Sequence, residues 1–186
     1  MELMHGHRQE LLLFGAGHVG QEVAQRVRGL PFRLTWIDQR PDIFPVDAAD
    51  HCLQSAADPL AVVAQARTNS VFVVMTHSHQ LDLAIVSAAL ADDRFPYVGL
   101  IGSKKKIRTI LGNLHASGVS RERLEAVHAP VGLELGAVSP TEIAVSILAE
   151  LIAVRRGVAV VRPMKLEKSF LDSWLDRDQE KQSSNV

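Results

Sequence analysis

The sequence predicts an α/β protein with a doubly wound, mainly parallel sheet and helices on both faces. Three observations support this fold class. A short apolar run over 11–14 enters a G-x-G-x-x-G turn, and a helix pattern follows at once. Later apolar runs of strand length alternate with segments of helical periodicity, as in a chain of βαβ units. A second strand ends in an acid about 20 residues after the glycine motif, as nucleotide-binding folds of this kind do.

Each glycine of the first turn has its own physical task. Gly15 lets the chain turn sharply off the strand, and Gly17 has no Cβ to keep a phosphate from the backbone. Gly20 lets the helix pack closely on the strand. The free N–H groups at the start of the following helix attract an anion. The alternative is an ordinary tight turn between a strand and a helix.

The second strand, over 32–38, ends in Asp38, where a ribose-binding acid belongs. An acid at this position favours NAD over NADP, because it accepts hydrogen bonds from the ribose hydroxyls and repels a phosphate. Arg40 follows closely and weakens this preference.

The remaining elements are predicted from periodicity and from helix-start signals. The uninterrupted apolar run over 71–75 is typical of a strand buried on both faces. Asp58 before Pro59 indicates a capped helix start, and Ser139 with Glu142 forms a capping box. The predicted segments are a loop over 39–45, strands near 50–53 and over 71–75, 97–101 and 126–128, and helices over 59–67, 81–91, 104–117 and 140–155.

The expected strand order is 3-2-1-4-5, with or without a sixth strand, and the ligand sits where this order reverses. Thr76, His77 and His79 follow the fourth strand at this point. Two histidines there could ligate a metal, bind an anion or transfer protons. Their spacing departs from the H-x-H-x-D-H pattern of binuclear metallohydrolases, so no metal site is predicted. The alternatives are a solvated His79 and a helix cap from Ser78 or Asp82.

A second glycine-to-helix junction follows the fifth strand. Gly102 allows close approach, Ser103 can cap the helix or donate a hydrogen bond, and three lysines follow at 104–106. Lysines at a helix start oppose the macrodipole, and a bound phosphate would offset that cost. The alternative is a surface lysine run without a ligand.

Composition fits one globular domain. The chain has 186 residues, 47% of them hydrophobic, and a formal net charge of −1. We expect a single Rossmann-like domain over 1–162 and a polar, partly disordered C-terminal extension over 163–186. The near-neutral charge gives no reason to expect a nucleic-acid partner, and no apolar run is long enough to span a membrane. Cys52 is the only cysteine, so we expect a cytoplasmic location and a buried structural thiol.

The motifs taken together resemble one family. They are F-G-A-G-H-V-G, W-I-D-Q-R-P, M-T-H-S-H-x-x-D, V-G-L-I-G-S-K-K-K and P-V-G-L-E-L-G-A-x-S-P-T-E-I-A-V-S-I-L-A-E. Over about Leu11 to Arg156 the chain resembles the Rossmann domain of the XdhC/CoxI family, accessory factors for xanthine dehydrogenase and related molybdenum hydroxylases. The positions of this chain within the motifs include Gly15, Gly17, His18, Gly20, Asp38, Arg40, His77, His79, Asp82, Gly102, Ser103 and Glu142.

The resemblance implies a non-enzymatic chaperone role. Such a protein would bind and protect the molybdenum cofactor, as molybdopterin or its cytosine dinucleotide form, and deliver it to apo-xanthine dehydrogenase or a related molybdenum hydroxylase. The resemblance also implies contact with a cysteine desulfurase. The glycine turn would hold the phosphate or dinucleotide end, and the loop with His77 would face the pterin or metal end.

One departure from the family pattern concerns the start of the chain. Family members usually carry a separate domain before the Rossmann unit, often with a cysteine implicated in the cofactor's chemistry. Here the first strand is expected from about Leu11, so we expect that domain to be absent or to reside on another chain. Sulfur handling by this chain alone is then not expected. A homodimer is expected on general frequency.

Two other functions fit the sequence. One is an NAD(P)-dependent oxidoreductase with His77 or His79 as proton donor, and the other is an NAD-sensing regulatory module. Asp38 supports both, because plain molybdopterin ends in a monophosphate and has no ribose. The acid is also consistent with the cytosine dinucleotide form. Gly17→Val would abolish binding under all three hypotheses, whereas His77→Ala would separate impaired activation of a hydroxylase from lost hydride transfer.

Overall fold

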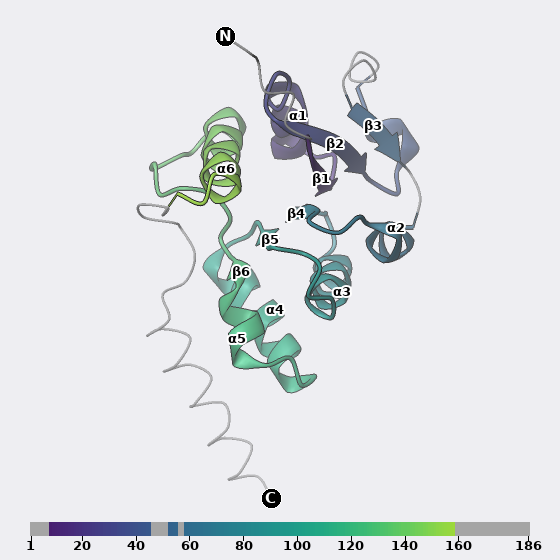
Figure 1. Ribbon diagram of the computed structural model, residues 1–186, viewed down its shortest axis with the longest axis vertical. Helices are drawn as coiled ribbons and strands as arrows, with labels where there is room; N and C mark the ends of the chain where they lie inside the picture. Colours follow the sequence, from purple (N-terminus) through teal and green to yellow (C-terminus); the bar gives the residue numbers. More distant parts are fainter. Residues whose placement is uncertain (1–7, 46–51, 56–57, 159–186) are drawn as a thin grey trace, which may run out of the picture.

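The computed structural model describes residues 8–45, 52–55 and 58–158. They form one six-stranded sheet in the order β3-β2-β1-β4-β5-β6, with helices packed against it (Figure 1). Every neighbouring pair of strands runs parallel. The predicted fold class and strand order are therefore confirmed, with β6 as the sixth strand. The predicted extension over 163–186, its boundary at 162 and the side chain of Cys52 lie outside the described residues.

The elements alternate along the chain as a doubly wound fold requires. In order they are β1 (Gln9–Phe14), α1 (His18–Arg26), β2 (Phe32–Ile37), a short 3-10 helix η1 (Pro41–Ile43), β3 (Cys52–Ser55), α2 (Pro59–Gln65), β4 (Val71–Val74), α3 (His79–Leu90), β5 (Tyr97–Leu100), α4 (Lys104–Ala116), α5 (Arg121–Glu125), β6 (Val127–His128) and α6 (Pro140–Arg155).

Local capping explains where the helices begin. Helix α3 begins two residues earlier than predicted, because the Ser78 hydroxyl accepts a hydrogen bond from the N–H of Leu81 (3.3 Å). The predicted capping box at Ser139 is present and starts α6. Helix α5 was not predicted; its cap is Ser120, whose hydroxyl accepts from the N–H of Arg123. With only five residues, α5 has too little periodicity to recognise in a sequence.

The sheet separates two hydrophobic cores. Side chains alternate along β1, so that Leu12 and Phe14 belong to the core under α2, α3 and α4, whereas Leu11 and Leu13 belong to the core under α1 and α6. All four side chains are buried, as expected for the central strand of a parallel sheet. None of the helices in the described part of the chain combines the length and the apolar character that a membrane crossing requires.

A buried carboxylate fixes the loop between β6 and α6. Glu150 lies in α6 and is 0% exposed; its two oxygens accept from the N–H of Gly132 and pair with Nδ1 of His128. The ring of Tyr97 lies against that of His128, with centroids 4.3 Å apart. Burial, and then the nearby Glu150 charge, raise the pKa of the Tyr97 hydroxyl well above its ordinary value. This loop therefore enters α6 in one fixed path.

Candidate functional site

The glycine turn between β1 and α1 is held by close backbone packing. Gly15 has a φ of +117°, and a Cβ there would lie 2.4 Å from the carbonyl oxygen of Met75. A Cβ on Gly20 would lie 2.2 Å from the carbonyl oxygen of Gly15. That same oxygen accepts a hydrogen bond from Nε1 of the buried Trp36 (3.0 Å). Gly20 is therefore required for packing α1 onto the turn, as predicted, and Gly15 is required for the path of the turn beside Met75.

Gly17 lies in a different environment. Its backbone is extended, and no atom lies within 4 Å of the position that a Cβ would occupy. As the N-cap of α1 it provides no side-chain hydrogen bond, and the first turn contains no acid. His18, the first residue of the helix, is exposed. The start of α1 therefore leaves both space and unpaired N–H groups for an anion.

Asp38 stands at the end of β2, next to this turn. It is 5% exposed and accepts four hydrogen bonds. Oδ2 accepts from the backbone N–H of Ala16 (2.9 Å) and from Nη2 of Arg40 (2.8 Å). Oδ1 accepts from the backbone N–H (3.1 Å) and from Nε (2.9 Å) of Arg40. Burial acts to raise the pKa of Asp38, but the hydrogen bonds from Arg40 and Ala16 outweigh it and lower the pKa to about 2.

This arrangement occupies the acceptor positions that a ribose would need. A carboxylate has about four lone-pair positions, and Asp38 already accepts four hydrogen bonds. A ribose diol could reach it only by displacing the guanidinium of Arg40. The Arg40 side chain is 44% exposed, so it has solvent to move into.

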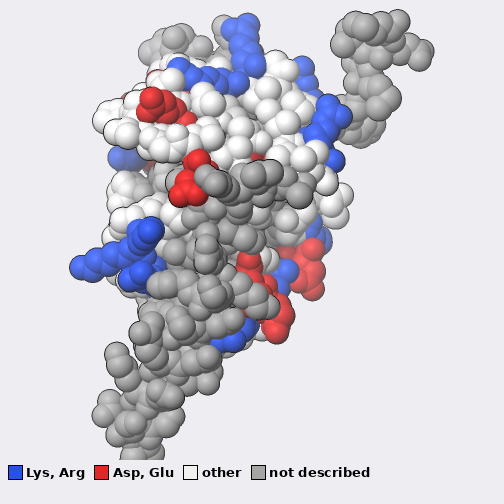
Figure 2. Space-filling model, turned by 90° about the vertical axis from the view of Figure 1, so that its left-hand side faces the viewer, with Lys and Arg blue, Asp and Glu red and all other residues white. Residues whose placement is uncertain are grey.

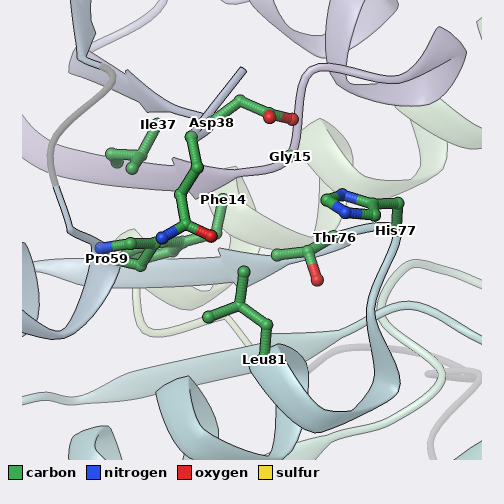
Figure 3. Close-up of a pocket in the computed structure, with 9 residues that line it drawn as sticks. Phe14, Gly15, Ile37, Asp38, Pro59, Thr76, His77 and Leu81 are labelled. Atoms are coloured by element: carbon green, nitrogen blue, oxygen red, sulfur yellow. The ribbon is translucent and has the colours of Figure 1, made fainter.

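A narrow crevice lies at the carboxyl ends of β1, β2 and β4, where the strand order reverses. Figure 3 shows Asp38 reaching toward Gly15 on one side, with Thr76 and His77 on the neighbouring loop. The crevice leaves about 10 Å³ open to a water-sized molecule. A larger ligand must displace its exposed side chains, Gln39 and His77. The residues around it are Phe14, Gly15, Ile37, Asp38, Gln39, Pro59, Thr76, His77 and Leu81.

A buried ion pair supports the loop that carries Thr76. Asp82 in α3 is 0% exposed, and its Oδ1 accepts from the backbone N–H (2.9 Å) and the hydroxyl (2.7 Å) of Thr76. Its Oδ2 lies 2.5 Å from Nζ of Lys106 in α4. Asp82 therefore ties together the end of β4 and the starts of α3 and α4. The helix cap is Ser78, not Asp82.

The lysine run at the start of α4 contains one paired and two exposed side chains. Lys106 opposes the macrodipole of its own helix, and the buried carboxylate of Asp82 compensates its charge. Lys104 and Lys105 are exposed. The hydroxyl of Ser103 accepts from the N–H of Lys106 (3.3 Å) and caps α4.

The structure brings only some of the predicted site residues together. Gly15, Asp38, Thr76 and His77 line the crevice. His18 lies at the start of α1 and His79 at the start of α3, both exposed and outside the crevice lining. Gly102 and Ser103 follow β5, whose neighbour in the sheet is β4.

Sequence reasoning missed two features of this region. Gln39, Pro59 and Leu81 line the crevice, and they carry no chemical signal that could have indicated it. The pairing of Asp82 with Lys106 was also missed. A lone carboxylate in the otherwise apolar helix over 79–90 was a usable signal for a buried charge, because such a group needs a partner.

Comparison with known proteins identifies related sequences. The family described as XdhC Rossmann domain matches residues 11–151. The protein is 33% identical over 159 residues to the uncharacterized protein YqeB of Escherichia coli K12, covering 83% of this chain and 29% of that one. It is 32% identical over 159 residues to a probable xanthine dehydrogenase subunit of Bacillus subtilis 168, covering 83% and 45%.

Two further similarities are shorter or structural. The molybdenum cofactor insertion chaperone PaoD of Escherichia coli K12 is 33% identical over 97 residues, covering 52% of this chain and 30% of PaoD. The crystal structure of a xanthine dehydrogenase from Bacillus halodurans superposes with a TM-score of 0.69 at 28% identity, covering 81% of this chain and 43% of that one. The chain thus spans less than half the length of each of these relatives.

Proposed function

The chain belongs to the XdhC Rossmann-domain family, and from this premise we propose that it is an accessory protein that binds the molybdenum cofactor. It would aid insertion of the cofactor into a molybdenum hydroxylase of the xanthine dehydrogenase type. The similarity to a molybdenum cofactor insertion chaperone supports this role over about half of the chain. The proposed partners are the hydroxylase and a cysteine desulfurase, and we further propose that the protein forms a homodimer.

The open, uncapped start of α1 is the observation on which the proposal depends. Molybdopterin ends in a phosphate, and the space above Gly17 together with the N–H groups from His18 onward suits a phosphate. Thr76 and His77, on the far side of the crevice, would then contact the pterin end. The exposed position of His77 allows it to swing aside as the crevice opens.

The environment of Asp38 bears on which form of the cofactor binds. All its acceptor positions are used by Ala16 and Arg40, so it has no free position for a ribose hydroxyl. This supports plain molybdopterin over the cytosine dinucleotide form. The same reasoning weighs against NAD(P), and therefore against the oxidoreductase and the NAD-sensing module. His79, Gly102 and Ser103 would contact only a ligand that extends beyond the crevice.

Ligand content after purification without oxygen tests the proposal. The protein is prepared from cells able to make the cofactor, and molybdenum, oxidised pterin and nicotinamide are assayed in one sample. We expect near-stoichiometric molybdenum and pterin. Nicotinamide without molybdenum would overturn the proposal in favour of an oxidoreductase or an NAD sensor. An empty protein is tested again with the partner chain supplied, and a second empty result would also overturn it.

Two pairs of variants make this test specific. Gly17→Val should abolish cofactor binding with only a small loss of thermal stability, because its side chain enters open space and the cost is limited to a poorer helix N-cap. Gly20→Ala should instead destabilise the fold, because its Cβ would meet the carbonyl oxygen of Gly15. His77→Ala should impair activation of the apo-hydroxylase, whereas His79→Ala, an exposed histidine outside the crevice lining, should not.

A further inference from the structure

A large groove lies at the end of the sheet opposite to the crevice. It has a volume of about 690 Å³ and contains the start of β1 with the residues just before it, the start of β2, the segment after α2 and the end of α6. Because all the strands are parallel, their amino ends share this edge and their carboxyl ends share the other. Its lining residues are Arg8, Gln9, Glu10, Arg33, Arg67, Thr68, Asn69, Arg155 and Arg156.

The groove carries a strong local positive charge. Five of its lining residues are arginines and one, Glu10, is an acid, whereas the whole chain has a formal net charge of −1. The side chain of Glu10 is already engaged, because its Oε2 accepts from the hydroxyl of Ser70 (2.6 Å) and from the backbone N–H of Arg67 (3.3 Å). Figure 2 shows Lys and Arg side chains gathered along the upper rim of the molecule.

Local helix energetics explain only part of this cluster. Arg155 and Arg156 lie at the end of α6, and Arg67 lies two residues beyond the end of α2, where positive charge favours the helix macrodipole. Arg33 is in β2 and Arg8 directly precedes β1, so neither gains from a helix end. Both are exposed, yet they line the same groove as the other three. Repulsion among Arg8, Arg33, Arg67 and Arg156 is unfavourable unless an anion is shared between them.

The surrounding backbone decides which kind of anion fits. Compact phosphates are usually bound by convergent backbone N–H groups at helix starts. Here the neighbouring helices α2 and α6 end at the groove, so their partial negative ends face it. An anion must therefore be held by long guanidinium side chains that reach outward. This favours several carboxylates spread along a segment, which arginines pair with in a bidentate manner.

We propose that this arginine groove docks an acidic segment of a partner protein, through carboxylate pairs with Arg8, Arg33, Arg67 and Arg156. The proposal does not depend on the ligand of the crevice. Because the groove lies at the opposite edge of the sheet, the docked partner leaves the crevice accessible. The protein could then hold a small molecule at one end and a protein at the other at the same time.

Fluorescence anisotropy with a labelled octaglutamate peptide tests the proposal on the full chain. We expect binding that weakens as salt rises, and no binding of an octaglutamine peptide. The double variant Arg33→Glu/Arg67→Glu should weaken octaglutamate binding at least about tenfold, because two attractions become repulsions. The control is Lys104→Glu/Lys105→Glu, which changes net charge equally at the opposite edge and should leave affinity within about twofold. Far-UV circular dichroism verifies that both variants fold.

Three results would overturn the proposal. The first is absence of octaglutamate binding, and the second is equal loss of binding in both double variants, which would indicate a net-charge effect only. The third is preference for another anion. Displacement of the peptide by equimolar inorganic pyrophosphate would indicate a small-anion site, and tighter binding of a short DNA duplex would indicate a nucleic-acid site.

Discussion

At Asp38, burial and hydrogen bonding act on one carboxyl group in opposite directions. Burial disfavours the charged form, but the fork of Arg40 and the N–H of Ala16 stabilise it more strongly. The residue that marks a ribose site in a sequence is therefore used here to orient an arginine and to hold the glycine turn. Its side chain is chemically occupied before any ligand arrives.

Removing the guanidinium of Arg40 should allow a nucleotide ribose to bind Asp38. Arg40→Ala frees two acceptor positions on Asp38, while the hydrogen bonds from the N–H of Ala16 and from the backbone N–H of residue 40 stay. We expect the affinity for NADH or AMP to rise about tenfold, the value of one to two hydrogen bonds. Isothermal titration calorimetry measures it. The control is the double variant Arg40→Ala/Asp38→Asn, in which the affinity should not rise. An unchanged affinity in Arg40→Ala alone would mean that Asp38 does not face the ligand.

The same carboxyl group makes stability depend on acid pH. The pKa of Asp38 is about 2 in the folded chain and 3.8 in its reference state. Its contribution is therefore fully present above about pH 4 and is lost as the pH falls toward 2. We expect Asp38→Asn to flatten the pH dependence of the free energy of unfolding in this window by about 1–2 kcal/mol, allowing for the solvent around Arg40. Urea titrations between these pH values test the sign; a steeper dependence in the variant would contradict it.

Among the elements, α3 and α4 are joined to β4 by one buried carboxylate. Asp82 bonds Thr76 in the loop after β4 and pairs with Lys106 in α4, so three segments meet at a charge that is removed from water. Such pairs add little over apolar packing, but breaking one is costly because a buried charge remains. These contacts fix the position of Thr76 in the loop that also carries His77.

Breaking this pair should be more damaging than removing a neighbouring charge. Lys106→Met leaves Oδ2 of Asp82 buried without its only charged partner in the described part of the chain. We expect a loss of about 3 kcal/mol in the free energy of unfolding, measured by urea denaturation. Lys105→Met, one residue away and exposed, should change it by less than about 0.5 kcal/mol. Similar losses in both variants would show that the ion pair contributes no more to the free energy of unfolding than an exposed lysine does.

At the scale of the whole molecule, the described residues form two cores on opposite faces of one sheet. Neighbouring residues of β1 contribute to different cores, and both cores contain fully buried aromatic side chains, Phe72 on one side and Trp36 on the other. A parallel sheet covered on both faces cannot lose one core without exposing its strands. We therefore expect the two cores to unfold as one cooperative unit.

Matched truncations on the two faces test this cooperativity. Leu12→Ala and Leu13→Ala each remove a buried side chain and should cost about 2–5 kcal/mol. In a Trp174→Phe background, tryptophan fluorescence reports only the core that contains Trp36. Leu12→Ala, in the other core, should still shift the fluorescence midpoint in urea as far as the circular dichroism midpoint. Separate midpoints would show that the cores unfold independently.

The sequence by itself determined the fold class, the strand order and the caps at Asp58 and Ser139. These features depend on local periodicity and on hydrogen bonds within a few residues, so a linear pattern contains them. It also identified which loops surround the crevice, because the carboxyl ends of parallel strands always share one edge.

Only the tertiary structure decided how the charged side chains are used. The pairing of Asp38 with Arg40 depends on the orientation of two nearby side chains, and the pairing of Lys106 with Asp82 depends on the distance between two helices. The arginine groove likewise collects residues from four separate segments. Electrostatic interactions depend on spatial separation and burial, and neither quantity is present in residue order alone.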